Sequence, residues 1–403
     1  MTTSILLLAV AAETSDFIPP LWRILTKSAY FGGVGFALGA VVVHLAAVRP
    51  ALLSPFAVPT DRTIIRRRSG AVMGCAGLVL LFVLYPQLAG KVARAGEGMP
   101  FVDALSPLVV WEYLLLAPKP GEWLSVGNMA FLQFGMHAAF AVLLTLLLFT
   151  RMRERIDQVA LGAGMGIAVA SLILLVPRNF SSETPTGFFV HLLSLLHPLS
   201  GGVWLGGLFA LTALAFSRSR LSPSGGFVWA QIWKRFSVVA QVCVGIVLVS
   251  GLWEVWEAVG GIPQLWETPY GRVLLLKTLL VGSLISIGFF NEFVLLPKAM
   301  KLRTLGDHRG LFSLVLHHFP RVVAVEVVLG LGVLTVTPFL NGSAREQVGG
   351  AADPEPTAGI LLAVILLLAF GVLSFIANAK FQGLQERRIE KDKQDSVDSV
   401  SSA

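Results

Sequence analysis

Long apolar stretches, separated by polar loops, follow one another along almost the whole chain. Windows of about twenty mainly apolar residues are long enough for a helix to cross a bilayer. Nine such windows occur, at 27–48, 70–92, 124–150, 157–177, 187–216, 236–259, 272–296, 321–341 and 358–378. The pattern predicts an all-α bundle of about nine transmembrane helices. Because the last window follows a polar loop, we expect an eight-helix core with one additional C-terminal helix.

The loops between these windows alternate in charge. Basic residues gather in every second loop, at 49–68, 151–155, 218–235, 298–309 and 380–393. The intervening loops carry acidic residues, among them Glu97, Asp103 and Glu183. Since Lys and Arg are enriched in cytoplasmic loops, the alternation predicts an N-terminus outside the cell and a C-terminus in the cytoplasm.

The pattern divides the chain into five segments. We expect an extracytoplasmic segment at 1–26, a first four-helix half at 27–177, a second four-helix half at 187–341, the additional helix at 358–378 and a charged, disordered cytoplasmic tail at 379–403. The sequence YFGGVGFALGA at 30–40 resembles LSGGVWLGGLFA at 199–210. A parallel repeat of two halves would explain this similarity, and so would small residues at close helix contacts.

The composition excludes several classes of protein. Hydrophobic residues make up 55% of the chain and charged residues 14%, against roughly 25% charged in soluble domains, so the expected surrounding is a lipid bilayer. The net charge of +7 lies in the loops and does not indicate a nucleic-acid partner. Cys75 and Cys243 cannot form a disulfide framework. We expect no enzyme, because no nucleotide-binding glycine loop is visible and a redox enzyme would need a bound cofactor.

The fifth span carries the most informative polar residues. His191 and His197 lie in its outer half, and an ionisable side chain inside a membrane usually faces a bundle interior or a wet cavity. They are on different faces of a regular helix, so both could bind one ion only if the helix breaks. Pro198 favours such a break; a continuous, kinked helix is the alternative. Trp204 would share the face of His197.

Other polar residues lie at the outer ends of the next two spans. Glu254 and Glu257 are one turn apart, and together with His191 they would form a mouth that attracts cations. Solvated glutamates are the alternative interpretation. Lys277 lies a turn or two inside the seventh span, where it either snorkels to the surface or pairs within the bundle.

Four further residues fall deeper in the bundle. Asn291 ends the seventh span and Glu326 lies early in the eighth, so Glu326 either makes an interhelical hydrogen bond or belongs to an ion path. Met136 and His137 lie near the middle of the third span. Thioether and imidazole groups are ligands that suit monovalent copper.

Several of these positions resemble the bacterial copper resistance protein D family. The similarity is carried by His197 with Trp204, Gly206 and Gly207, by 236–251, by TPYGRVLLLK at 268–277, and by Asn291 and Glu326. The resemblance implies a multi-pass protein of the bacterial cytoplasmic membrane that moves copper inward after delivery by a periplasmic copper-binding protein. The ligands would come from His191, His197, Glu254 and Glu257, with Met136 and His137 midway.

Two other hypotheses remain open. The first is a redox protein in which haem b is held between His137 and His197, since bundles hold haem with histidines from facing helices. The second is a non-catalytic accessory subunit of a larger membrane complex, suggested by the additional helix and the charged tail. A homo-oligomer is compatible with each of the three.

Overall fold

The bundle is built from long apolar helices. The computed structural model describes residues 18–55, 57–96, 98–179, 185–216, 218–222 and 224–350, and most of 359–373. Within these residues, eight helices are long and apolar enough to cross a membrane, and no strand occurs. They cover 21–52, 59–95, 126–148, 150–175, 187–215, 225–258, 269–303 and 308–339. The prediction of a multi-pass all-α fold is therefore confirmed.

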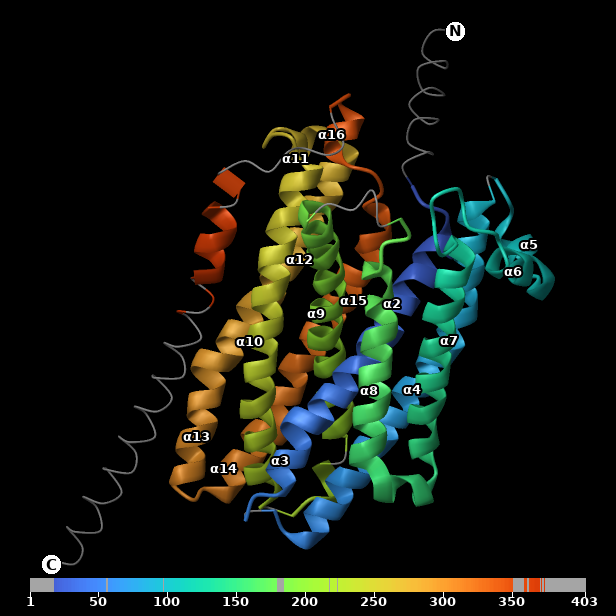
Figure 1. The fold of residues 1–403 in the computed structure, drawn as a ribbon. Coiled ribbons are helices and arrows are strands. Elements are labelled where there is room, and N and C mark those ends of the chain that lie inside the picture. Colours follow the sequence, from blue (N-terminus) through green and yellow to red (C-terminus); the bar gives the residue numbers. More distant parts are fainter. Residues whose placement is uncertain are drawn as a thin grey trace, which may run out of the picture.

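Each spanning segment has one principal helix (Figure 1). These are α2 (Leu21–Val42), α4 (Pro59–Ala95), α7 (Val126–Thr145), α8 (Ile156–Leu172), α9 (Pro185–Ala215), α10 (Gly225–Ala258), α12 (Pro269–Phe290) and α15 (Phe319–Val336). π-Helical turns extend three of the segments. The turn Val43–Val48 leads into α3 (Arg49–Leu52), and the turn Asn291–Leu295 leads into α13 (Leu296–Thr304). The turn Leu314–His318 follows α14 (His308–Ser313) and leads into α15. The short helices are α5 (Phe101–Ala104), α6 (Pro107–Leu114), α11 (Gln264–Glu267) and α16 (Ala344–Gln347).

The bundle has two chemically different ends. One, the α11 end, carries α11 and α16; the other, the α14 end, carries α3, α13 and α14 (Figure 1). The basic loops at 49–68, 151–155 and 298–309 all lie at the α14 end. This segregation is what the loop pattern requires if all eight segments run from end to end.

Glycines allow α2 and α9 to cross at very close range. A Cβ on Gly39 would lie 2.2 Å from the backbone nitrogen of Gly207, and one on Gly35 would lie 2.9 Å from Cα of Gly202. Only glycine fits at such a contact, because any side chain would meet backbone. The two similar glycine-rich stretches in the sequence thus pack against each other.

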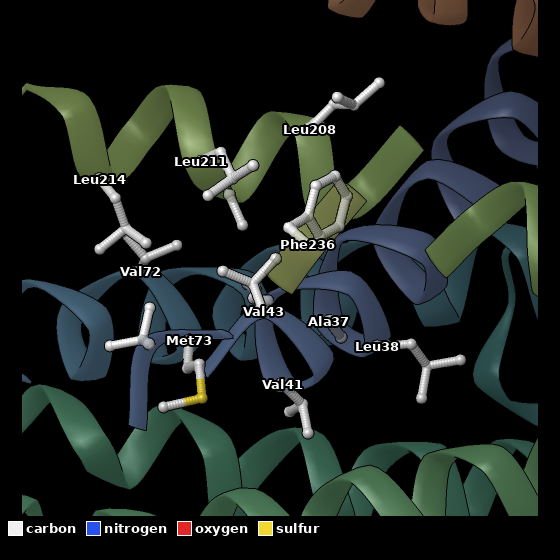
Figure 2. Close-up of a cluster of buried hydrophobic side chains, with 14 of the residues drawn as sticks. Ala37, Leu38, Val41, Val43, Val72, Met73, Leu208, Leu211, Leu214 and Phe236 are labelled. Carbon is white, nitrogen blue, oxygen red and sulfur yellow. The ribbon is translucent and has the colours of Figure 1, made fainter. Parts of the chain in front are cut away.

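Apolar side chains fill the space around this crossing. Figure 2 shows them converging from α2, α4, α9 and α10, with Val43, Met73, Leu211 and Phe236 among the buried members. Phe236 occupies the position that a Cβ on Gly207 would need, 2.3 Å from its ring. The glycines therefore position both the backbone crossing and the ring beside it.

The fifth span is one continuous helix. α9 runs from Pro185 to Ala215 with Pro198 inside it, so of the two alternatives at Pro198 the structure shows the continuous helix. Pro198 removes one backbone hydrogen bond from α9. The packing of α9 against α2, α10 and α15 holds the helix together around this residue. The expectation for 1–26 also changes, because α2 already begins at Leu21.

The predicted ninth helix and the tail lie largely outside the described residues. Residues 362–369 are helical. Ile360 and Val364 pack against Leu193, Val249 and Trp253 of α9 and α10. The span at 358–378 and the tail at 379–403 stay predictions.

Candidate functional site

His197 is held in one tautomer by its neighbour on α10. Its Nδ1 lies 2.9 Å from Oγ of Ser250, and the Ser250 hydroxyl donates to the carbonyl of Ile246 at 2.6 Å. Because that hydroxyl proton is already used, Oγ must accept the hydrogen bond from Nδ1–H of His197. Nε2 therefore carries no proton in the neutral ring, and its lone pair is available to a metal ion.

Glu254 faces that lone pair. Its Oε2 lies 3.9 Å from Nε2 of His197, a separation too long for a hydrogen bond. The side chains are 18% and 36% exposed respectively, so both are partly buried. Two acceptors that face each other in a partly buried place repel unless a cation or proton lies between them.

The separation of these two atoms is one that a bridging metal ion can span. Bonds from imidazole nitrogen and carboxylate oxygen to a transition metal are about 2.0–2.2 Å long. Two such ligands on one ion can therefore lie up to roughly 4 Å apart. The pair of His197 and Glu254 meets this condition with its distance of 3.9 Å.

Three more groups define the surroundings of the pair. Lys277 on α12 is close enough for its charge to act on both His197 and Glu254. Glu257 adds a second negative charge that acts on Glu254. A Cβ on Gly251 would lie 3.2 Å from Cε1 of His197, so the absence of a side chain there leaves room for the ring.

The other predicted ligands lie elsewhere. His191 is on α9 as well but is exposed. His137 and Met136 are on α7, which packs on α4 and α8 and not on the elements around His197. Trp204 is buried in the core with 5% exposure. Among the described residues no group of three or more His, Cys, Asp or Glu side chains is close enough to hold a metal ion.

His137 repeats the arrangement seen at His197. Its Nε2 lies 3.1 Å from Oγ of Ser171, and Ser171 donates to the carbonyl of Ile167 at 2.8 Å. Nδ1 of His137 is buried without a hydrogen-bond partner. Since His137 and His197 are bonded to serines on different helices, the described residues give no support to haem held between them.

A second polar cluster joins α12 to α15. Nδ2 of Asn291 donates to Oε1 of Glu326 at 3.3 Å. Glu292, the next residue, accepts a hydrogen bond from the hydroxyl of Ser237 on α10. The interhelical hydrogen bond expected for Glu326 is present.

Sequence reasoning missed the residues that orient these groups. Ser250 and Ser171 are recognisable only once the helices are packed, because they lie 53 and 34 residues from their histidines. A further histidine, His44 in the π turn after α2, has its Nε2 2.8 Å from Oδ1 of Asp157 and its Nδ1 2.9 Å from Oγ of Ser69. No local signal in the sequence indicates these partners.

The fold defines a multi-pass helical membrane protein, and a facing imidazole and carboxylate are groups with which proteins hold cations. Residues 230–340 match the family model described as copper resistance protein D. This part of the chain is thus similar to the copper resistance protein D family. The matched region includes Ser250, Glu254, Lys277, Asn291 and Glu326, while His197 precedes it.

Two curated proteins are similar to the chain. It is 33% identical over 233 residues to the copper transport protein CutJ of Bacillus subtilis (strain 168), a match that covers 55% of this chain and 38% of CutJ. It is 25% identical over 306 residues to copper resistance protein D of Pseudomonas syringae pv. tomato, covering 73% of this chain and 89% of that protein. The chain thus spans about two fifths of CutJ. No solved structure matches it. Both relatives are named for copper, and neither name describes an enzyme.

Proposed function

We propose that this protein transports copper ions across the bacterial cytoplasmic membrane, from the outside inward. The observation that carries the proposal is the lone pair of His197 Nε2 facing Oε2 of Glu254 across 3.9 Å. Similarity to the copper resistance protein D family and to two proteins named for copper supports copper as the cargo over other cations. Imidazole binds copper readily, and a carboxylate adds the charge that a cation needs.

The proposed path begins at the α11 end. With the basic loops at the α14 end in the cytoplasm, the pair of His197 and Glu254 lies in the outer part of the membrane. Glu257 and His191 would raise the local cation concentration at this mouth. His137 and Met136 belong to the other group of four helices and are not part of this path.

Lys277 has a defined role in the proposal. In the empty site its positive charge balances Glu254, which limits the cost of a buried carboxylate. A copper ion that binds Glu254 takes over this balancing role, so Lys277 and copper compete for the same carboxylate. The competition weakens binding, which a transporter needs if the ion is to leave the site again.

The outward-facing mouth leaves the delivery of copper to another molecule. A periplasmic copper-binding protein is the partner that suits this position, because free copper is scarce and a docked donor would pass the ion directly to His197. CutJ, which extends well beyond the matched region, is named as a copper transport protein, in agreement with this role.

Copper uptake into proteoliposomes tests the proposal. We expect His197→Ala and Glu254→Gln to reduce uptake about tenfold or more, because each removes one ligand of the ion. The matched controls are His318→Ala and Glu267→Gln, which change an exposed histidine and an exposed glutamate outside the site. Wild-type uptake by both ligand variants at equal protein content would contradict the proposed role of the pair.

A further inference from the structure

The cluster of Asn291 and Glu326 contains two buried oxygen atoms that lack partners. Glu326 is 2% exposed and Asn291 6%. After the single bond from Asn291 Nδ2 to Glu326 Oε1, Oδ1 of Asn291 and Oε2 of Glu326 remain without a hydrogen bond. Both atoms are acceptors when the carboxyl is ionised, and a buried acceptor without a hydrogen bond lowers the stability of the fold.

The elements around Glu326 offer it little positive charge. α15 packs on α12, α9, α2 and the turn Leu314–His318. α9 has no ionisable side chain after His197, and α2 has none after Tyr30. The π turn that follows α12 adds only Glu292, which is itself acidic. His317 and His318 in the turn before α15 and the exposed Arg321 of α15 lie toward the α14 end, and the ionisable groups of α12 lie toward the α11 end.

The π-helical turn at Asn291–Leu295 presents two consecutive polar side chains to different helices. Asn291 bonds to Glu326 on α15, and Glu292 bonds to Ser237 on α10. π-Turns inside helices are rare and frequently occur at functional sites. Here the turn places the amide of Asn291 beside the one carboxyl of α15.

We propose that Glu326 and Asn291 form a proton-binding site. A proton on Oε2 of Glu326 makes this atom a donor to Oδ1 of Asn291, so the amide and the carboxylic acid close a ring of two hydrogen bonds. One proton satisfies both orphan oxygens at once. A metal cation fits less well, because hard cations require about six oxygen ligands and only two are free here.

The proton can leave when the helices separate slightly or when water enters, and the carboxylate then attracts a cation. If this exchange couples a proton gradient to copper movement, that coupling rests on the proposed function. The binding of the proton to Glu326 does not depend on the proposed function. The site lies on α12 and α15, away from His197 and Glu254, so each can be tested without the other.

Infrared spectroscopy of the purified protein tests the proton site. The wild type is expected to show the carbonyl band of a protonated carboxylic acid at neutral pH, and Glu326→Gln is expected to lose it. Glutamine can make the same two-bond ring with Asn291, so this variant should keep the thermal stability of the wild type. Asn291→Leu cannot form the ring and should lower the unfolding temperature. Glu267→Gln, at an exposed position, should leave the band unchanged.

Three results would overturn the proton site. These are a wild-type spectrum without the band, a band that persists in Glu326→Gln, and a stability that rises on addition of sodium ions, which would identify a metal cation in place of the proton. A copper titration of Glu326→Gln separates the two proposals. We expect Glu326→Gln to bind copper as tightly as the wild type does. A wild-type protein that shows the infrared band but takes up no copper would contradict only the proposed function.

Discussion

At the scale of single residues, a serine hydroxyl decides which nitrogen of each histidine faces the site. Ser250 and Ser171 each donate to a backbone carbonyl four residues earlier, which leaves only their lone pairs for the imidazole. The ring nitrogen opposite the serine is then unprotonated and aimed away from it. At His197 this nitrogen faces Glu254, whereas at His137 it is buried without a partner. The same serine–histidine hydrogen bond therefore produces a candidate ligand pair at only one of the two histidines.

Replacement of Ser250 tests this control. Ser250→Ala removes the acceptor that holds Nδ1–H, and loss of such an orienting partner typically lowers metal affinity about 10–100-fold. Competitive titration with a copper chelator measures the change. Ser250→Thr retains a hydroxyl and should keep most of the copper affinity of the wild type. A purely structural role of Ser250 would not require a hydroxyl at this position. Ser171→Ala, the matched change at His137, should leave the affinity unaltered; an equal loss in both alanine variants would contradict the assignment.

At the scale of helices, the crossing of α2 and α9 organises the bundle. Gly35 and Gly39 on α2 meet Gly202, Gly206 and Gly207 on α9 through backbone contacts. Without a hydrophobic effect between helices in lipid, close van der Waals packing of this kind supplies much of the association. Because α9 also carries His197, the crossing positions one half of the candidate site.

Gly39→Ala should disrupt this crossing. The added Cβ would lie 2.2 Å from the backbone nitrogen of Gly207, so the helices must separate, at a cost of about 1–3 kcal/mol or more. Thermal unfolding in detergent should show a midpoint several degrees lower. Gly245→Ala on α10 is the matched control, since a Cβ there meets nothing within 4 Å and alanine favours a helix by about 1 kcal/mol. Equal midpoints for the two variants would exclude a tight crossing.

At the scale of the whole molecule, the sequence predicted the layout of helices better than the contacts between them. Eight of the predicted windows coincide with the eight spanning segments, because long apolar runs and loop charges are local properties. The structure extends several of these segments past the predicted limits, for example to 59–95 instead of 70–92. Polar residues at helix ends lowered the window averages there without ending the helices.

The candidate site was predicted only in part, for a related physical reason. Depth along the bundle follows from sequence position, and this placed His197 and Glu254 near the same end. The face on which a side chain lies depends on helix packing, which the sequence did not reveal for His137 or Met136. The sequence left open whether Pro198 breaks α9, and the helix is continuous because contacts from neighbouring helices outweigh the one hydrogen bond that Pro198 removes.

X-ray absorption spectroscopy at the copper edge tests the central claim most directly. The purified full-length protein, loaded with one equivalent of monovalent copper under reducing conditions, should show scattering from one imidazole ring with a nitrogen at about 2.0 Å. In His197→Ala this ring scattering should disappear, whereas in His318→Ala it should remain. Loss of the imidazole signal in His197→Ala alone is the result that the account predicts. An unchanged spectrum in that variant would contradict it, because copper would then be bound elsewhere in the molecule.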